Sequence, residues 1–327
     1  MTSAKNRGIY IVKGLTNMNN KQTIINIKKR AEYLEKIRRY FKNLDTLEVD
    51  TPLAYSHGVT DPFIDVFAID TVAGKRYLQS SPEYAMKRLL AAGSGSIYQI
   101  CKAFRDEPCG HQHNHEFTMI EWYRVGIDYF QLMKEIEGLF LAVKSDVEFV
   151  YLSYREAFEK NYGFDPHKLT LDELVAQVHK YVGEIQGLDN PTIADCLDIL
   201  FSYKIEKNLN AENTAYFIYD YTIHQSALAK KVTDKNGQLV AARFEVFYNG
   251  TELANGYYEL INKSEQLKRF EKDLAIRKEQ GKPTIEIDTK FLECLDNLPE
   301  CSGVALGFDR LLMSLENIKD IKKLSIF

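Results

Sequence analysis

The sequence predicts an α+β fold in which a mostly antiparallel sheet is flanked by helices. Two stretches rich in strand signals, at 97–124 and 215–260, are separated by a largely helical stretch at about 151–210. The strands do not alternate regularly with helices, as they would in a parallel βαβ fold. The 327 residues are enough for one large hydrophobic core or two smaller ones.

The composition excludes several classes of protein. Of the residues, 45% are hydrophobic and 27% are charged, and no apolar run approaches the roughly 18–20 residues of a membrane span. The first residues lack an apolar segment, so we expect no secretory signal. The five cysteines form no CxxC pair, which indicates reduced thiols and a cytoplasmic location. A net charge of −4 argues against a protein that coats nucleic acid.

The first predicted element is an amphipathic helix at about 23–43, where apolar residues follow the helical period. Residues 1–43, including Lys5, Arg7 and Lys13, carry many more basic than acidic side chains. Two interpretations of this block remain open: a surface for an acidic partner or RNA, and the solvated face of the helix. The following LEVDTPLAY is extended, and its proline bars a central strand beyond that point.

The segment RYLQSSPEYAMKRLLAAG predicts a strand and then a helix. Ser81 is a candidate N-cap, Pro82 suits the first helical position, and Gly93 is placed to end the helix. The next two strand signals, SIYQICKAFRDE and EFTMIEWYRV, predict an antiparallel pair joined by a long polar loop. Long loops in compact domains are usually functional.

That loop contains the stretch CGHQHNHEF, with histidines at alternate positions 111, 113 and 115. A strand would place these histidines on one face, where they could bind zinc or iron. The alternative interpretation is a polar loop that happens to be rich in histidine. The spacing alone does not decide between them.

The remaining chain begins with the helical stretch at about 151–210, which is predicted to be an insertion. Its signals are the capping box from Thr170 to Glu173 and the helical run ADCLDILFSYKIEKNL. Strand signals return at AYFIYDY and LVAARFEVFYNGTELANGYYEL. A charged helix, SEQLKRFEKDLAIRKEQG, follows, and CSGVALGFDRLLMSL is a short strand that enters a helix.

Asn249-Gly250 predicts a hairpin with a two-residue type I′ turn. In that register Phe247 opposes Glu252, so Glu245 and Glu252 share a face as a diagonal pair, roughly 7–8 Å apart. Two such carboxylates could hold Mg²⁺ between them. Glu259 follows beyond a glycine, where a bulge could turn it towards the same cleft. The alternative is an exposed acidic face on an edge hairpin.

The strand pair at 97–124 offers groups for a nucleotide. Arg105 and Glu107 are predicted to share one face of the first strand, and Phe117, Glu121 and Tyr123 one face of the second. Arginine binds phosphate oxygens, phenylalanine stacks on a base, and Glu121 could hold an ammonium group. A structural ladder of salt bridges is the alternative.

The stretch GVALGFDRLLM adds a second basic group. Gly303 and Gly307 are expected to let a flat ligand approach the backbone closely. Arg310 falls in the first turn of the next helix, where a phosphate is also favoured. Together the three regions predict a nucleotide-activating site, although the sequence has no P-loop.

These regions together resemble the class II aminoacyl-tRNA synthetase core, over about residues 20–320. The first helix with LEVDTP resembles motif 1, FRDE…HNHEF resembles motif 2, and GVALGFDR resembles motif 3. SPEYAMKRLLAAG, HNHEFTMIEWY and ELANGYYEL resemble the lysyl branch, although His115 stands where proline is common. The histidine stretch therefore resembles a loop that closes over ATP, and we do not expect a transition metal there.

Too few residues precede the first helix for an anticodon-binding OB-fold, so we expect 1–327 to form a single catalytic domain. The chain resembles the short lysyl-synthetase paralogues that ligate a lysine to translation elongation factor P. Lysyl-tRNA synthetases more often have glycine where Ala305 stands. In this respect the chain resembles the paralogues, which prefer (R)-β-lysine over lysine. The resemblance also implies a homodimer through 23–52 and no stable binding of tRNA.

The resemblance assigns roles to individual residues. Arg105 and Arg310 are the catalytic residues, which hold the α- and γ-phosphates of ATP, and Phe117 stacks on adenine. The expected ATP site comprises Arg105, Asp106, Glu107, His113, Asn114, Phe117, Glu252, Leu253, Gly307 and Arg310. The expected amino-acid site comprises Ser81, Pro82, Glu83, Glu121, Tyr123, Glu259 and Ala305. Glu245 and Glu252 are the expected Mg²⁺ ligands.

Three other functions remain as alternatives. The chain could be a minimal lysyl-tRNA synthetase that charges tRNA. It could also be an amide-forming ligase for a small molecule, as in the asparagine synthetases related to class II enzymes. Finally, it could be an inactive synthetase paralogue that acts as a regulatory binder, although such a protein has no need of both phosphate-binding arginines.

Overall fold

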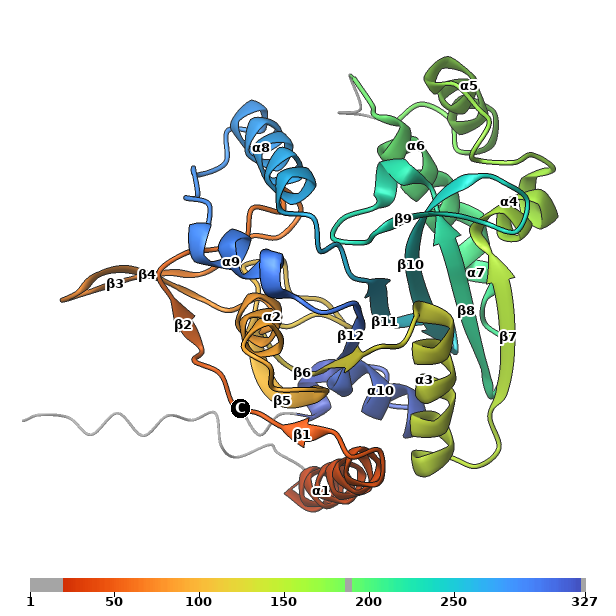
Figure 1. Ribbon diagram of the computed structural model, residues 1–327. Coiled ribbons are helices and arrows are strands. Elements are labelled where there is room, and N and C mark those ends of the chain that lie inside the picture. Colours follow the sequence, from red (N-terminus) through yellow and green to blue (C-terminus); the bar gives the residue numbers. More distant parts are fainter. Residues whose placement is uncertain (1–19, 186–189, 325–327) are drawn as a thin grey trace, which may run out of the picture.

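A nine-stranded sheet forms the centre of the molecule in the computed structural model, which describes residues 20–185 and 190–324 (Figure 1). The strand order is β1-β5-β6-β12-β11-β10-β8-β7, and β9 pairs with β10. Neighbours are antiparallel except for the pairs β1–β5 and β7–β8. The strands are β1 (Leu47–Glu48), β5 (Ile97–Phe104), β6 (Glu116–Val125), β7 (Glu148–Ser153), β8 (Thr214–Tyr221), β9 (Lys231–Thr233), β10 (Leu239–Tyr248), β11 (Thr251–Tyr258) and β12 (Cys301–Gly307).

Helices flank this sheet, so the predicted α+β class with a mostly antiparallel sheet is confirmed. A small second sheet has the order β2-β4-β3, with β2 (Ala54–Tyr55), β3 (Ala68–Thr71) and β4 (Gly74–Leu78). The α-helices are α1 (Asn20–Asn43), α2 (Glu83–Ala91), α3 (Tyr129–Val143), α4 (Tyr154–Tyr162), α5 (Leu171–Tyr181), α6 (Ile193–Leu200), α7 (Glu206–Asn208), α8 (Lys263–Glu279), α9 (Thr289–Cys294) and α10 (Phe308–Leu315). None of the helices in the described ranges has the length and hydropathy that a membrane crossing requires.

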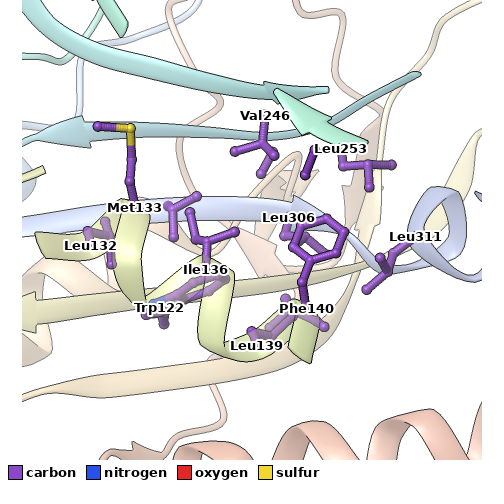
Figure 2. Close-up of a cluster of buried hydrophobic side chains, with 14 of the residues drawn as sticks. Trp122, Leu132, Met133, Ile136, Leu139, Phe140, Val246, Leu253, Leu306 and Leu311 are labelled. Carbon is purple, nitrogen blue, oxygen red and sulfur yellow. The ribbon is translucent and has the colours of Figure 1, made fainter. Parts of the chain in front are cut away.

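The main hydrophobic core lies between the sheet and α3. Figure 2 shows α3 directing large apolar side chains against the central strands, which contribute Trp122, Val246 and Leu306. Asp128 begins the helix with a capping box, because its side chain accepts a hydrogen bond from the backbone of Gln131 at 2.8 Å. This packing buries one face of the sheet and holds the strands that carry the candidate site.

Helix α1 confirms the predicted amphipathic helix. Ile37 and Phe41 are fully buried, whereas the side chain of Ile24, near the helix start, is 51% exposed. Part of the basic block is neutralised within the chain, because Lys29 pairs with Glu316 and Arg38 with Glu48. Lys5, Arg7 and Lys13, which belong to the same basic block, lie outside the described residues.

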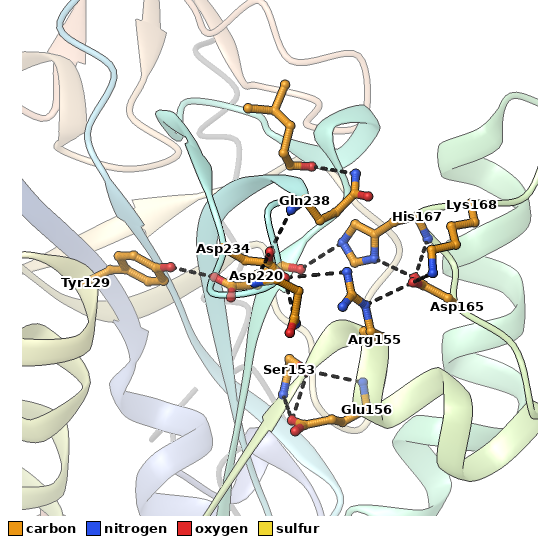
Figure 3. A network of polar contacts seen from close by, with 12 residues as sticks. Tyr129, Ser153, Arg155, Glu156, Asp165, His167, Lys168, Asp220, Asp234 and Gln238 are labelled. Atoms are coloured by element: carbon orange, nitrogen blue, oxygen red, sulfur yellow. Dashed lines mark hydrogen bonds and ion pairs between the residues drawn. The ribbon is translucent and has the colours of Figure 1, made fainter.

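The helical stretch between β7 and β8 consists of α4 to α7, with a π-helical turn at Phe201–Ile205. The predicted capping box at Thr170 is confirmed. A buried polar network joins this stretch to the sheet (Figure 3). Arg155 lies 3.0 Å from Asp165 and 3.5 Å from Asp234, and His167 Nε2 lies 3.2 Å from the carbonyl oxygen of Asp220. These contacts fix the helices against β8 and the turn before β10.

The predicted hairpin at Asn249-Gly250 is also confirmed. Both residues have positive φ, 50° and 72°, as a type I′ turn requires. Phe247 opposes Glu252 as predicted, but a β-bulge follows between Val246 and Phe247. Glu245 therefore pairs with Asn255 rather than in the simple diagonal register. The sequence analysis expected a bulge in this hairpin, but nearer to Glu259. The bulge between Val246 and Phe247 was not predicted.

Candidate active site

A cavity of about 330 Å³ opens over β6, β11 and β12 and is walled by α2, α8 and the loop between β5 and β6. Twelve of the predicted site residues line it: Ser81, Glu83, Arg105, Glu107, His113, Asn114, Phe117, Glu252, Leu253, Ala305, Gly307 and Arg310. Five others do not line it: Pro82, Asp106, Glu121, Tyr123 and Glu259. Glu245 does not line it either. The twelve residues come from four separate stretches of the sequence, 81–83, 105–117, 252–253 and 305–310, which thus meet at one cavity.

Arg105 and Phe117 form one wall of the cavity. Strand β5 ends at Phe104, so Arg105 and Glu107 lie in the following loop and not on the strand face that the sequence predicted. The guanidinium carbon of Arg105 lies 5.3 Å from the centre of the Phe117 ring. Arg105 Nε is buried and has no hydrogen-bond partner within the described chain. A buried, unpaired guanidinium nitrogen is a site for an anion such as a phosphate.

Arg310 approaches the same cavity from the first turn of α10. It donates a hydrogen bond to the carbonyl oxygen of Glu252 at 3.0 Å, and its Nη2 lies 2.7 Å from His113 Nε2. Burial, and then the charge of Arg310, lower the pKa of His113, so the imidazole is neutral and can accept this hydrogen bond. The loop between β5 and β6 is therefore held close to Arg310.

The histidine stretch is a loop, as the second interpretation held. The backbone N–H of Gly110 donates to the carbonyl oxygen of His113 at 3.0 Å, which makes a tight turn. His115 contacts Phe67 edge to face, whereas the side chain of His111 is exposed. Within the described residues, no three His, Cys, Asp or Glu side chains are grouped as metal ligands.

Glu121 lies beneath the cavity and not on its surface. Its carboxylate accepts hydrogen bonds from Ser81 Oγ at 2.7 Å and from the hydroxyl of Tyr123 at 2.6 Å. Burial, and then the charge of Glu83, raise the pKa of Glu121 to about 8. Ser81, which lines the cavity, also accepts a hydrogen bond from the N–H of Glu83 at 3.0 Å. The prediction of Ser81 as the N-cap and Pro82 as the first helical residue was wrong by one position, because the helix begins at Glu83 with Pro82 as its N-cap.

Lys87 is the principal residue that the sequence analysis missed. Its side chain is 1% exposed, and Nζ lies 2.6 Å from both Glu83 and Glu259. The two carboxylates outweigh the effect of burial and raise the pKa of Lys87. Burial raises the pKa of Glu259 to about 7, although Lys87 opposes this shift. A lysine four residues after a glutamate indicates an exposed helical ion pair, so its burial had no sequence signal.

Glu259 occupies a different position from the one predicted. It lies beyond the end of β11 and reaches Lys87, and it does not line the cavity. Both of its oxygens are buried and lack a hydrogen bond of normal geometry within the described chain. A buried carboxylate that retains free acceptor positions is suited to a second cation beside Lys87.

Gly303 does not leave space for a flat ligand, in contrast to the prediction. A Cβ atom at this position would lie 2.3 Å from the Tyr123 ring and 2.5 Å from Glu259 Oε1. Glycine at this position therefore leaves room for the side chains of Tyr123 and Glu259, which belong to the buried pocket formed around Glu83, Glu121, Glu259 and Lys87. Gly307 lines the cavity, and the nearest atom to a Cβ there would be 3.7 Å away, in Arg310.

Glu245 and Glu252 have different surroundings. Glu245 is paired with Arg243 and accepts a hydrogen bond from the Tyr221 hydroxyl at 2.7 Å. Burial raises the pKa of Glu245 above its ordinary value, and the charge of Glu252 adds to this shift. Glu252 faces the cavity with its side chain 42% exposed. Their joint binding of Mg²⁺ stays a prediction.

The sequence analysis also missed one wall of the cavity. Helix α8 contributes Gln266, Phe270 and Asp273, and the loop after β2 contributes Thr60 and Asp61. The spacing of the three α8 residues corresponds to one helix face. Because two of the three are polar, this face has no hydrophobic period by which the sequence could reveal it.

Comparison with known proteins assigns this architecture to a family. Residues 9–327 match the family model described as tRNA synthetases class II (D, K and N). The chain is 41% identical over 298 residues to the elongation factor P–(R)-β-lysine ligase of Pasteurella multocida, covering 89% of this chain and 91% of that protein. It is 43% identical over 300 residues to the ligase of the same name from Vibrio atlanticus, with the same two coverages.

Proposed function

The chain belongs to the class II tRNA synthetase family of the D, K and N type, and we propose that within it the protein is an elongation factor P–(R)-β-lysine ligase. The reaction has two steps. The carboxylate of the amino acid first attacks the α-phosphate of ATP, which gives an aminoacyl-adenylate and pyrophosphate. The ε-amino group of a lysine on elongation factor P then attacks the adenylate, and AMP leaves.

The observation that carries this proposal is that basic side chains suited to phosphates and acidic side chains suited to ammonium groups line the same cavity. Arg105 and Arg310 line the cavity and suit a triphosphate, and Glu83 lines it as well and is joined through Lys87 to the buried Glu259. The relatives with this ligase name align over about nine-tenths of the chain. Positive groups for phosphates beside negative groups for ammonium ions suit the adenylation of a diamino acid.

The residues present fit ATP. The unpaired Nε of Arg105 is available to an oxygen of the α-phosphate, and Arg310 to the γ-phosphate. Phe117 offers its ring to adenine, and the remaining predicted nucleotide contacts are proposals of the same kind. Mg²⁺ usually binds through one or two carboxylates together with phosphate oxygens. Glu252 faces the cavity and, with Glu245 behind it, would supply these carboxylates; the ion would neutralise phosphate charge.

The protein's main contribution to the chemistry is positioning. Arg105 fixes the α-phosphate opposite the amino-acid carboxylate, which converts an encounter of two molecules into a reaction within one complex. Glu83, Glu121 and Glu259 hold the ammonium groups, and Tyr123 orients Glu121 through its 2.6 Å hydrogen bond. Charge that develops on the phosphate is stabilised by arginines that are already in place.

The assembly and the domain organisation are further parts of the proposal. The segment at 23–52 exposes Ile24, Ile25 and Leu47, with Leu53 adjoining, as expected of a homodimer interface. The protein would act in the cytoplasm as a single catalytic domain, with the helices at about 151–210 as an insertion. The methyl group of Ala305 lines the cavity and would favour (R)-β-lysine over lysine.

The test is ATP–pyrophosphate exchange by the purified protein with magnesium, across the amino acids and both enantiomers of β-lysine. We expect (R)-β-lysine to drive exchange best and the activated residue to pass to purified elongation factor P, detected as a mass increase. Exchange led by lysine, with transfer to tRNA, would favour the minimal lysyl-tRNA synthetase. Absence of exchange with every amino acid would refute the ligase and favour the regulatory binder.

A further inference from the structure

The α8 wall of the cavity contains two carboxylates that no step described above uses. Asp61, from the loop after β2, and Asp273, from α8, both line the cavity. Within residues 20–185 and 190–324, no ion pair reaches either side chain; Asp61 Oδ1 accepts a hydrogen bond from the backbone N–H of Phe63 at 2.8 Å, and Asp273 accepts one from the Thr60 hydroxyl at 3.4 Å. Two carboxylates that face a cavity without a cationic partner favour a cationic ligand.

A third polar group on the same wall has an atom with no hydrogen-bond partner at all. Gln266 is 1% exposed and lines the cavity, and its Nε2 has no hydrogen-bond partner in the described chain. It lies almost two helical turns before Asp273, on the same face of α8. A buried amide group that faces a cavity without a partner indicates that a polar ligand completes its hydrogen bonding.

This wall is held in place by contacts away from the cavity. Arg277, near the end of α8 and 3% exposed, donates hydrogen bonds to the carbonyl oxygens of Asp61 at 2.9 Å and Ile64 at 3.2 Å. Lys282 donates to the carbonyl oxygen of Pro62 at 2.7 Å. Because these bonds fasten the loop to the helix, Asp61 and Asp273 are positioned as a pair before any ligand binds.

The carboxylates of Asp61 and Asp273 are not needed to balance the charge of the amino-acid substrate, because other groups already do so. The inner pocket contains three carboxylates, Glu83, Glu121 and Glu259, and one buried cation, Lys87. The net charge of these four groups, when ionised, balances the two ammonium groups of a diamino acid. Asp61 and Asp273 are additional to that balance, so they are available to a further cation that is not the amino-acid substrate.

We propose that Asp61 and Asp273 form the binding site for the ε-ammonium group of the acceptor lysine. This inference rests on the proposed function, in which the second step delivers a lysine side chain to the same cavity. The unpaired amide of Gln266 would bind the polypeptide or the adenylate beside this site. Apart from Mg²⁺, which Glu252 and Glu245 would hold, the acceptor lysine is the one cation of the reaction that the inner pocket does not accommodate.

The pair also suits the proton transfer that the second step needs. The acceptor ammonium gives one proton to the Asp273 carboxylate, and the freed nitrogen lone pair then forms a bond to the adenylate carbonyl carbon. The bond from that carbon to the phosphate oxygen breaks, and AMP leaves, taking the second amine proton on its phosphate. Burial, and then the charge of Asp61, raise the pKa of Asp273 to about 7, which makes it a competent proton acceptor near neutral pH.

The test compares the two half-reactions in Asp273→Asn and Asp61→Asn, with Glu271→Gln as the matched control. Glu271 lies on the same helix but is exposed and outside the cavity. We expect both asparagine variants to keep ATP–pyrophosphate exchange and to lose about tenfold to a hundredfold in single-turnover transfer to elongation factor P. Transfer to hydroxylamine, which is uncharged near neutral pH, should be unchanged, and the control should behave as the wild type.

The outcomes separate this inference from the proposed function. Wild-type protein without exchange, or with exchange but without transfer to elongation factor P, would refute the function and this inference with it. If the wild type performs both steps, transfer unaffected by either variant would refute the inference alone. A parallel loss of exchange, or an equal loss with hydroxylamine, would also overturn it, because the pair would then serve the adenylate and not the acceptor.

Discussion

Replacement of Lys87 by methionine should destabilise the protein strongly, in a manner that depends on pH. Lys87 Nζ lies 2.6 Å from two carboxylates, those of Glu83 and Glu259. Methionine has a similar volume and removes the charge. The Glu83 side chain is 17% exposed and can be solvated, whereas that of Glu259 is 1% exposed and cannot. Removing one partner of a buried ion pair costs about 3–5 kcal/mol, and we expect this cost because Glu259 is left alone.

The pH dependence follows from the carboxyl that remains. The pKa of Glu259 is already raised to about 7 by burial, against the opposing effect of Lys87, and loss of the lysine raises it further. A carboxyl whose pKa is higher in the folded state stabilises the fold below its unfolded pKa and loses that contribution as the pH rises through the folded pKa. The variant should therefore be closest to wild type in mild acid and furthest from it above neutral pH.

The assay is urea denaturation of the wild type, Lys87→Met, Glu259→Gln and the double variant, in mild acid and above neutral pH. We expect the double variant to be more stable than Lys87→Met, because a neutral amide opposite methionine leaves no isolated charge. A loss below about 1 kcal/mol for Lys87→Met above neutral pH would refute the reasoning. So would a double variant that is as unstable as the single one, since lost packing and not charge would then be the cause.

Three further outcomes can be measured with the exchange assay. Arg310→Ala should lower the exchange rate by about 10²–10³, because a preorganised group that stabilises phosphate charge is lost; a change below about tenfold would contradict its role. The KM for the amino acid should rise as the pH falls through the pKa values of Glu121 and Glu259, about 8 and about 7, because protonated carboxyls cannot hold ammonium groups. Gly303→Ala should abolish amino-acid-dependent exchange, since its Cβ would lie 2.3 Å from the Tyr123 ring, and nucleotide binding measured separately should persist.

The elements that the sequence predicted correctly are those with strong local rules. The α1 helix has an apolar period, the β10–β11 hairpin has Asn249-Gly250 at its turn, and Thr170 has its capping partner three residues later. The bulge between Val246 and Phe247 was not predictable in the same way. It depends on which register packs better against neighbouring strands, and that choice is made by tertiary contacts.

The residues in and beneath the cavity were also predictable to different degrees, depending on whether a local motif or tertiary contacts determine their position. Arg105 and Arg310 belong to short motifs, and polar side chains in such motifs usually point towards a ligand. Lys87 was missed because charged residues at helical spacing normally indicate an exposed face, whereas this lysine is buried against Glu83 of its own helix and Glu259 from a distant segment. A buried charge is recognisable only after its partners are placed in space.

Helix α8 extends this argument to a whole wall of the cavity. Gln266, Asp273 and Arg277 lie on the side of α8 that faces the protein, where an apolar stripe is normally expected. The helix therefore attaches partly through hydrogen bonds from Arg277 to backbone carbonyl oxygens of the loop after β2. Breaking one of these bonds would lower the stability of the fold. Because Arg277 supplies the attachment, Gln266 and Asp273 remain free to face the cavity. A helix that served only to cover the sheet would gain more from apolar residues at these positions, so the polar face indicates that this wall contacts a polar reactant.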